Sequence, residues 1–142
     1  MRLEALLRAH GFMRTERPPA LWEARTELER LVPLVGEMIA AALAGGGVLE
    51  QLTLAAANVA IEPPEEGDDG AQLPPPGEYV AISVRGATDL GPDARWLPGD
   101  SATGLLGRLG ARLDAAGARW AYVRRLPGEG SITVLLDRAP QS

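Results

Sequence analysis

The sequence contains no cysteine and no lysine, and it has a single histidine, His10. The absence of cysteine excludes disulfides, thiolate metal sites and cysteine nucleophiles. One histidine also disfavours a zinc centre and a Ser-His-Asp arrangement. All positive charge lies on arginine and the net charge is −5, so we expect no broad basic face and no nucleic-acid partner.

Long hydrophobic runs are missing as well. The longest, MIAAALAGGGVL, is shorter than the roughly 20 apolar residues that a helix needs to cross a bilayer. The N-terminal stretch MRLEALLRAHGFMR is interrupted by charged residues and lacks the continuous apolar core of a signal peptide. These features predict a cytoplasmic protein without a membrane partner.

The residues that are present favour one globular domain. Hydrophobic residues make up 46% of the 142 positions, enough for a single core at this length. The stretch EPPEEGDDGAQLPPPG combines acidic residues, glycine and proline, and predicts an exposed loop. Its carboxylates lack the ligand spacing of a calcium loop, so we expect no metal site there.

Three helices are expected in the first half of the chain. Residues 2–10 have helical spacing, so residues 1–19 form an N-terminal helix and linker. Residues 20–44 place apolar residues at steps of three and four, which predicts a longer helix that Pro33 kinks or divides. The alanine-rich residues 48–61 predict the third helix.

The apolar seam of the predicted 20–44 helix is close to a heptad pattern. Such a seam packs against another helix or against a second copy of itself. We therefore expect a homodimer whose interface is drawn from Leu28, Leu31, Val35 and Met38.

From residue 78 the apolar period changes to two. Val80, Ile82 and Val84 alternate with more polar residues, which predicts a strand with one apolar face. A loop over residues 86–102 and a helix over residues 103–116 should follow.

The last two predicted elements are strands over residues 118–125 and 131–137, joined as a hairpin. The whole pattern predicts an α/β fold, a two-layer sandwich in which helices cover a mainly antiparallel sheet. This domain spans residues 20–138, and residues 139–142 form a tail.

Two segments resemble one family. The stretch ATGLLGRLGARLDAAGARWAYVRRLPGEGSITVLL is similar to the second glycine box and closing hairpin of the GHKL superfamily, the histidine-kinase-like ATPase domains. Those run GTGLGLA, a helix, then PGxGTTF with a strand. The stretch LEQLTLAAANVAIEP is similar to the family's LEQVLLNLLLNAIEA, so the likeness covers residues 48–138. The resemblance implies a histidine-kinase ATPase-like fold, ATP and Mg²⁺ as cofactors, and a place in two-component signalling.

The positions that bind the nucleotide in the family differ here. When this stretch is aligned with the family, Ala55 and Val59 stand where the family has two asparagines. The resemblance implies that the second of these is the position of a magnesium ligand. Asn58 is one residue early, a rotation of about 100° on a helix. Gly86 replaces the aspartate that reads adenine, and Leu90 replaces a glycine. The resemblance thus implies a degenerate domain that has lost ATP and Mg²⁺, with Asn58 as a structural amide.

The chain also departs from the family in its connections. Family members have a strand between the asparagine-bearing helix and the helix before it, whereas here GGG joins the two predicted helices directly. A sheet that lacks an edge strand exposes a new edge. That edge must be covered, shortened or paired, for example by another subunit.

These points lead to three functional hypotheses. The first is a non-catalytic signalling or scaffold module that binds a signalling protein and has no catalytic, cofactor or metal site. Trp96, in the loop DARWLPGD at the place of the nucleotide lid, is then an interaction candidate. The alternative is an active ATP-dependent protein kinase of the histidine-kinase or anti-sigma type, which would use Asn58, Asp89, Thr103 and Gly104.

The third hypothesis is a histidine phosphotransferase that uses His10. Related kinases phosphorylate a histidine in the exposed middle of a helix, followed by an acidic residue. In this sequence Gly11 follows and the helix ends. We therefore expect His10 to be an exposed residue that interacts with the C-terminal end of the helix dipole.

Overall fold

A computed structural model describes residues 3–44, 48–62, 76–87, 95–98, 120–126 and 129–140. Two helices and a 3₁₀ helix are described: α1 (Glu4–Ala9), α2 (Leu28–Ala44) and η1 (Leu49–Gln51). The strands are β1 (Arg14–Glu16), β2 (Thr53–Ile61), β3 (Gly77–Ala87), β4 (Arg95–Pro98), β5 (Trp120–Leu126) and β6 (Glu129–Asp137). The helix expected over residues 103–116 and most of the expected acidic loop lie outside the described residues.

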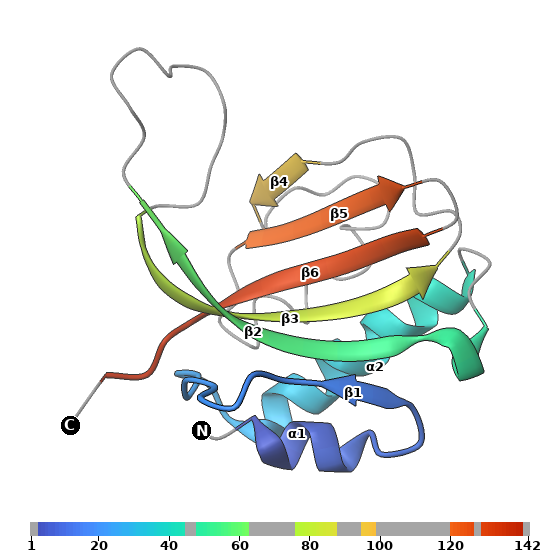
Figure 1. The fold of residues 1–142 in the computed structure, drawn as a ribbon, viewed down its shortest axis with the longest axis horizontal. Coiled ribbons are helices and arrows are strands. Elements are labelled where there is room, and N and C mark those ends of the chain that lie inside the picture. The colour runs from blue at the N-terminus through green and yellow to red at the C-terminus, as the bar shows by residue number, and fades with distance from the viewer. Residues whose placement is uncertain are drawn as a thin grey trace.

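The six strands form one sheet in the order β1-β2-β3-β6-β5-β4, shown in Figure 1. Only β1 and β2 pair in parallel, and every other neighbouring pair is antiparallel. The predicted α/β class, the mainly antiparallel sheet and the C-terminal hairpin are therefore confirmed.

Both helices lie on the same side of the sheet (Figure 1). Val80, Ile82 and Val84 of β3 are at most 1% exposed and belong to the main core, as their period of two predicts. Alternate residues of β2 and β6 join them: Leu54, Ala56, Ile132, Val134 and Leu136. Apolar residues of α1 and α2 complete the same cluster, so the N-terminal helix belongs to the domain.

The opposite face of the sheet has a smaller apolar cluster. Tyr79, Ala81 and Leu135 are buried there, with Val59 and Ile61 packed against them. On the two central strands the hydroxyl groups of Ser83 and Thr133 are 2.7 Å apart and hydrogen-bonded. The middle of the sheet is thus buried on both faces.

The long helix begins at Leu28 and not at residue 20, so the predicted start was wrong. The residues before it are extended, and the Arg25 N–H donates to the carbonyl oxygen of Asp137 at 2.9 Å. The Ala139 N–H donates to the carbonyl oxygen of Glu23 at 2.8 Å. These bonds satisfy the backbone of the segment without a helix. Further on, α2 continues through Pro33 without being divided.

The helix predicted over residues 48–61 is wrong as well. After the single turn of η1, the chain forms β2, which lies between β1 and β3. Leu52, Leu54 and Ala56 are buried at a period of two, the period of a strand. Alanine favours a helix only by fractions of a kcal/mol per residue, and pairing with two neighbouring strands outweighs that preference.

Close packing and backbone conformation both require glycine at position 86 of β3. It lies at a register shift of β3 against β6 and has φ +110°. A Cβ atom at this position would lie 2.7 Å from the carbonyl oxygen of Gln51. Glycine therefore lets η1 lie close against β3.

Both described helices are too short or too polar to cross a bilayer, and we find no membrane-spanning helix in this part of the chain.

Candidate functional site

Asn58 lies in β2 and binds backbone groups of a distant segment. Its side-chain oxygen Oδ1 accepts a hydrogen bond from the Trp22 N–H at 2.8 Å. Its Nδ2 donates to the carbonyl oxygen of Ala20, also at 2.8 Å. The amide thus pairs with the extended segment as a peptide group of a neighbouring strand would. Asn58 is a structural amide, as expected, although it lies on a strand and not on a helix.

Residues 20–25, which we call the strap, are held at two further points. The guanidinium of Arg138 lies 4.1 Å from the centre of the Trp22 ring, within the range of a cation–π contact. The same guanidinium donates to Glu78 at 2.6 Å. Ala24, fully buried, forms a β-bridge with Arg138. The strap therefore connects β2 with the residues at the C-terminal end of β6, and its polar groups stabilise the fold.

The seam predicted as a dimer interface lies inside the molecule. Leu31, Val35 and Met38 are 0% exposed, and Leu28 packs partly buried against the same core. They face the sheet of their own chain. This packing removes their apolar area from water without a second copy of the chain. The prediction that this seam joins two copies is therefore wrong.

The outer side of α2 carries a short apolar stripe. Val32 is 37% exposed and Leu43 is 41% exposed. Between them, a Cβ atom on Gly36 would have no atom within 4 Å apart from its chain neighbours and the backbone of its own helix. With two exposed apolar side chains, this stripe is too small to indicate a binding surface by itself.

His10 is buried, contrary to the expectation of an exposed residue. Its side chain is 5% exposed, and its Nδ1 lies 2.9 Å from the carbonyl oxygen of Leu6. Its ring is 5.8 Å from that of Phe12. The expected interaction with the end of the helix is present, since the ring binds a carbonyl of the last turn. The burial of the ring gives no support to the phosphotransferase hypothesis.

The remaining nucleotide and interaction candidates are only partly described. Trp96 lies in β4, where it pairs with Tyr122 of β5, so the expected 86–102 loop contains a strand. Asp89, Thr103 and Gly104 lie outside the described residues. Of the four residues named for the active-kinase alternative, Asn58 is therefore the one that the structure describes.

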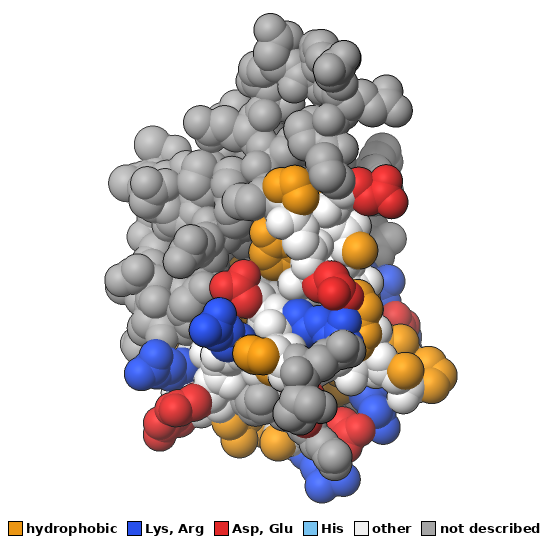
Figure 2. All heavy atoms as spheres, turned by 90° about the vertical axis from the view of Figure 1, so that its left-hand side faces the viewer, with side chains coloured by type: hydrophobic (Ala, Val, Ile, Leu, Met, Phe, Trp, Pro, Cys, Tyr) orange, Lys and Arg blue, Asp and Glu red, His pale blue; other side chains and the backbone are white. Residues whose placement is uncertain are grey.

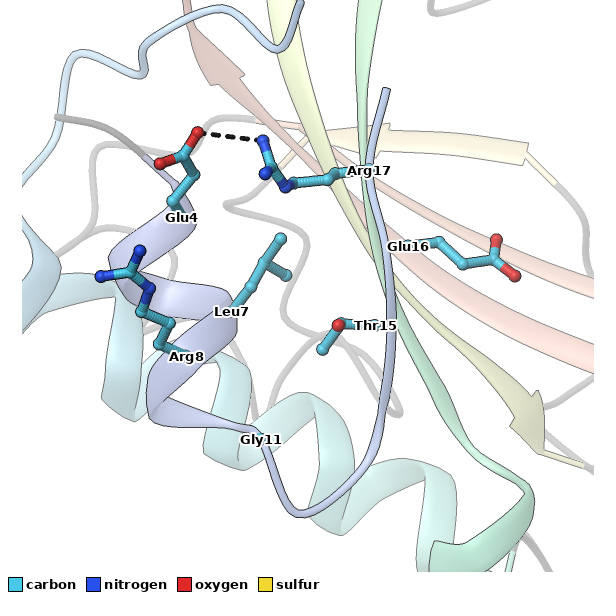
Figure 3. Close-up of a pocket in the computed structure, with 7 residues that line it drawn as sticks. All are labelled: Glu4, Leu7, Arg8, Gly11, Thr15, Glu16 and Arg17. Carbon is cyan, nitrogen blue, oxygen red and sulfur yellow. Dashed lines mark hydrogen bonds and ion pairs between the residues drawn. The ribbon is translucent and has the colours of Figure 1, made fainter. Parts of the chain in front are cut away.

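A groove that the sequence did not reveal lies between α1 and β1. Its volume is about 760 Å³. The lining residues are Glu4, Leu7, Arg8, Gly11, Thr15, Glu16 and Arg17 (Figure 3). Leu7 and Thr15 point toward each other across it, while Glu16 points away (Figure 3). Arg17 reaches back to Glu4, to which it donates at 2.9 Å.

Charge at this groove is only partly compensated. Glu16 forms an ion pair with Arg85 of β3 on the other face of the sheet. Glu4 is paired with Arg17. Over the described residues, Arg8 then has no carboxylate within ion-pairing distance. No sequence pattern indicated this groove. β1 has only three residues, too few for a visible period, and the two walls of the groove come from α1 and β1, which meet only in the folded chain.

The described residues contain no cluster of three histidine, cysteine or carboxylate side chains that could hold a metal ion. Among the described residues on the face shown in Figure 2, acidic and basic side chains lie next to one another, without a broad field of one sign. Neither observation points to a catalytic centre in this part of the chain.

Comparison of the sequence with models of protein families finds no match, and a comparison with curated proteins finds none. The function is therefore argued from the geometry of the chain itself.

Proposed function

We propose that the chain is a non-catalytic, cytoplasmic interaction module: a degenerate and shortened relative of the histidine-kinase-type ATPases that has lost ATP and Mg²⁺ and binds a signalling protein. The order of elements supports this kinship if the alignment with the family is shifted, so that α2 is compared with the family's asparagine-bearing helix. In the family a strand precedes the asparagine-bearing helix, and here β1 lies between α1 and α2. In this register α2, and not residues 48–61, takes the place of the nucleotide-site helix.

The composition of α2 is the observation that carries the proposal. This helix, LERLVPLVGEMIAAALA, packs on the sheet and has no asparagine, glutamine or aspartate. Its only polar side chains are those of Glu29, Arg30 and Glu37. A helix in this place therefore offers no side-chain amide oxygen to a phosphate-bound Mg²⁺ ion, and an amide oxygen is the ligand type that the family uses.

Asn58 does not supply the missing amide. Both polar atoms of its side chain are satisfied by the strap. Binding a nucleotide through them would break the hydrogen bonds to the Trp22 N–H and the Ala20 carbonyl, at a net cost of about 0.5–1.5 kcal/mol each. These two bonds favour the non-catalytic proposal over the active-kinase alternative, which used Asn58 as its amide.

A thermal-shift titration with Mg-ATP tests the proposal, because a ligand raises the melting temperature only if it binds the folded state. We expect an unchanged melting temperature up to millimolar Mg-ATP. A saturable rise at submillimolar ATP would contradict the proposal. Repeating the titration with Glu37→Gln would then show whether α2 holds the metal, since this change removes the only carboxylate in the middle of the helix.

A further inference from the structure

Among the strands that the structure describes, β1 is an edge of the sheet with a partner on one side only. It pairs with β2, and the described residues supply no strand on its other side. Arg14, Thr15 and Glu16 are all exposed. In a strand, backbone N–H and C=O groups point alternately to the two sides, so part of this backbone is open to another chain.

The groove beside this edge fits an extended segment. It runs between β1 and α1, and its volume of about 760 Å³ is in the range of ligand clefts. Leu7, which is 7% exposed, contributes an apolar surface to it, and Thr15 lies opposite (Figure 3). A segment added to β1 would therefore place alternate side chains toward α1.

The charges that remain free along this edge are positive. Arg8 lines the groove, and Arg14 lies on the other face of β1, beside Glu16. Neither arginine forms an ion pair within the described residues, whereas Glu4 and Glu16 are both paired. An acidic segment thus finds an unpaired cation on each face of the edge strand, in a protein whose net charge is −5.

We propose that the groove between α1 and the free edge of β1 binds an extended acidic segment of a partner protein, which adds to the sheet as a further strand. This inference rests on the proposed role as an interaction module. A basic segment is disfavoured by Arg8 and Arg14. A second copy is a poorer occupant, because pairing two β1 edges would bring the Arg8 side chains of both copies to one groove.

The probe is an eight-residue peptide of alternating glutamate and threonine, which is acidic, soluble and favourable for a strand. Added to the ¹⁵N-labelled full chain, it should shift the backbone amide signals of Arg14, Thr15 and Glu16. The signals of Arg8 in α1 and of Gly11, which follows the helix, should shift as well. The shifts should saturate with a dissociation constant of roughly 0.1–1 mM, since only a three-residue edge is paired.

Two matched charge reversals separate the groove from general electrostatics. Arg8→Glu should weaken peptide binding roughly three- to tenfold, the range of an exposed ion pair turned repulsive. Arg30→Glu makes the same change on the exposed start of α2, where no ion pair is recorded among the described residues. It should leave the affinity within a factor of two. Arg8 and Arg30 are both exposed, so both variants should fold.

Two further peptides separate strand addition from charge alone. An alternating lysine and threonine peptide should not bind. A glutamate and threonine peptide with proline at its centre should bind at least fivefold more weakly, because proline removes a backbone donor from the added strand.

Several outcomes would overturn the inference. They are no saturable shift up to 5 mM peptide, equal binding of the lysine peptide, or equal losses in the two charge reversals. Concentration-dependent shifts of the β1 amides without peptide would assign the groove to a second copy. None of these results depends on ATP, so a failure of the proposed function in the Mg-ATP titration is distinguishable from a failure here.

Discussion

Replacing Asn58 by alanine removes both hydrogen bonds that fix the strap to β2. The Trp22 N–H and the Ala20 carbonyl then lose their partners. A typical hydrogen bond contributes about 0.5–1.5 kcal/mol net, and the two together give a loss of about 1–3 kcal/mol. The upper end applies if water does not reach the Trp22 N–H, which is partly buried.

Urea denaturation of wild type and Asn58→Ala measures this loss. For a domain of this size, 1 kcal/mol corresponds to about 3–5 °C, so the melting temperature should fall by about 3–15 °C. Gln51→Ala is the matched control, because it removes an exposed amide for which the structure records no side-chain hydrogen bond. It should change the free energy of unfolding by less than about 0.5 kcal/mol.

A local measurement distinguishes the strap from general destabilisation. In Asn58→Ala, hydrogen exchange of the Trp22 amide should become faster by more than that of the β3 amides, since its acceptor is gone. If Asn58→Ala is as stable as Gln51→Ala, or if the Trp22 amide exchanges as in wild type, the assignment of Asn58 as a structural amide is refuted.

Two further predictions follow from burial and backbone geometry. Leu31→Ala should lower the free energy of unfolding by about 2–5 kcal/mol at every protein concentration, whereas the neighbouring Val32→Ala should cost less than about 0.5 kcal/mol. A loss for Leu31→Ala that vanishes on dilution would restore the seam as a dimer interface. Gly86→Ala should cost at least about 2 kcal/mol by chemical denaturation, because the new Cβ meets the Gln51 carbonyl and the positive φ is strained. Wild-type stability in that variant would contradict the close approach of η1 to β3.

The sequence predicted the elements whose pattern is local and regular. β3 was recognised because Val80, Ile82 and Val84 alternate cleanly, and they are buried as expected. The closing hairpin was recognised from two strand-like segments around a turn. α1 was found from its helical spacing. In these segments propensity, pattern and tertiary environment agree.

β2 was missed because its pattern is ambiguous. Leu52 and Ala56 are four residues apart and fit a helical face, and only Leu54 between them reveals the strand. Its alanines favour a helix when considered alone. What decides is pairing with β1 and β3, whose residues are distant in the sequence. A one-dimensional pattern does not contain this information.

The candidate site was predictable only in part. That Asn58 is a structural amide could be predicted from the sequence. The partners of that amide could not, because Ala20 and Trp22 were assigned to a helix and in fact form the strap. The groove was hidden for a similar reason, since β1 carries no periodicity and α1 meets it only after both pack on the core.

One sample of the ¹⁵N-labelled chain, titrated first with Mg-ATP and then with the glutamate and threonine peptide, tests the central claim most directly. An interaction module without a nucleotide site predicts no amide shifts with millimolar Mg-ATP, followed by saturable shifts at β1 and α1 with the peptide. Saturable shifts of α2 amides with Mg-ATP at submillimolar concentration would contradict the account.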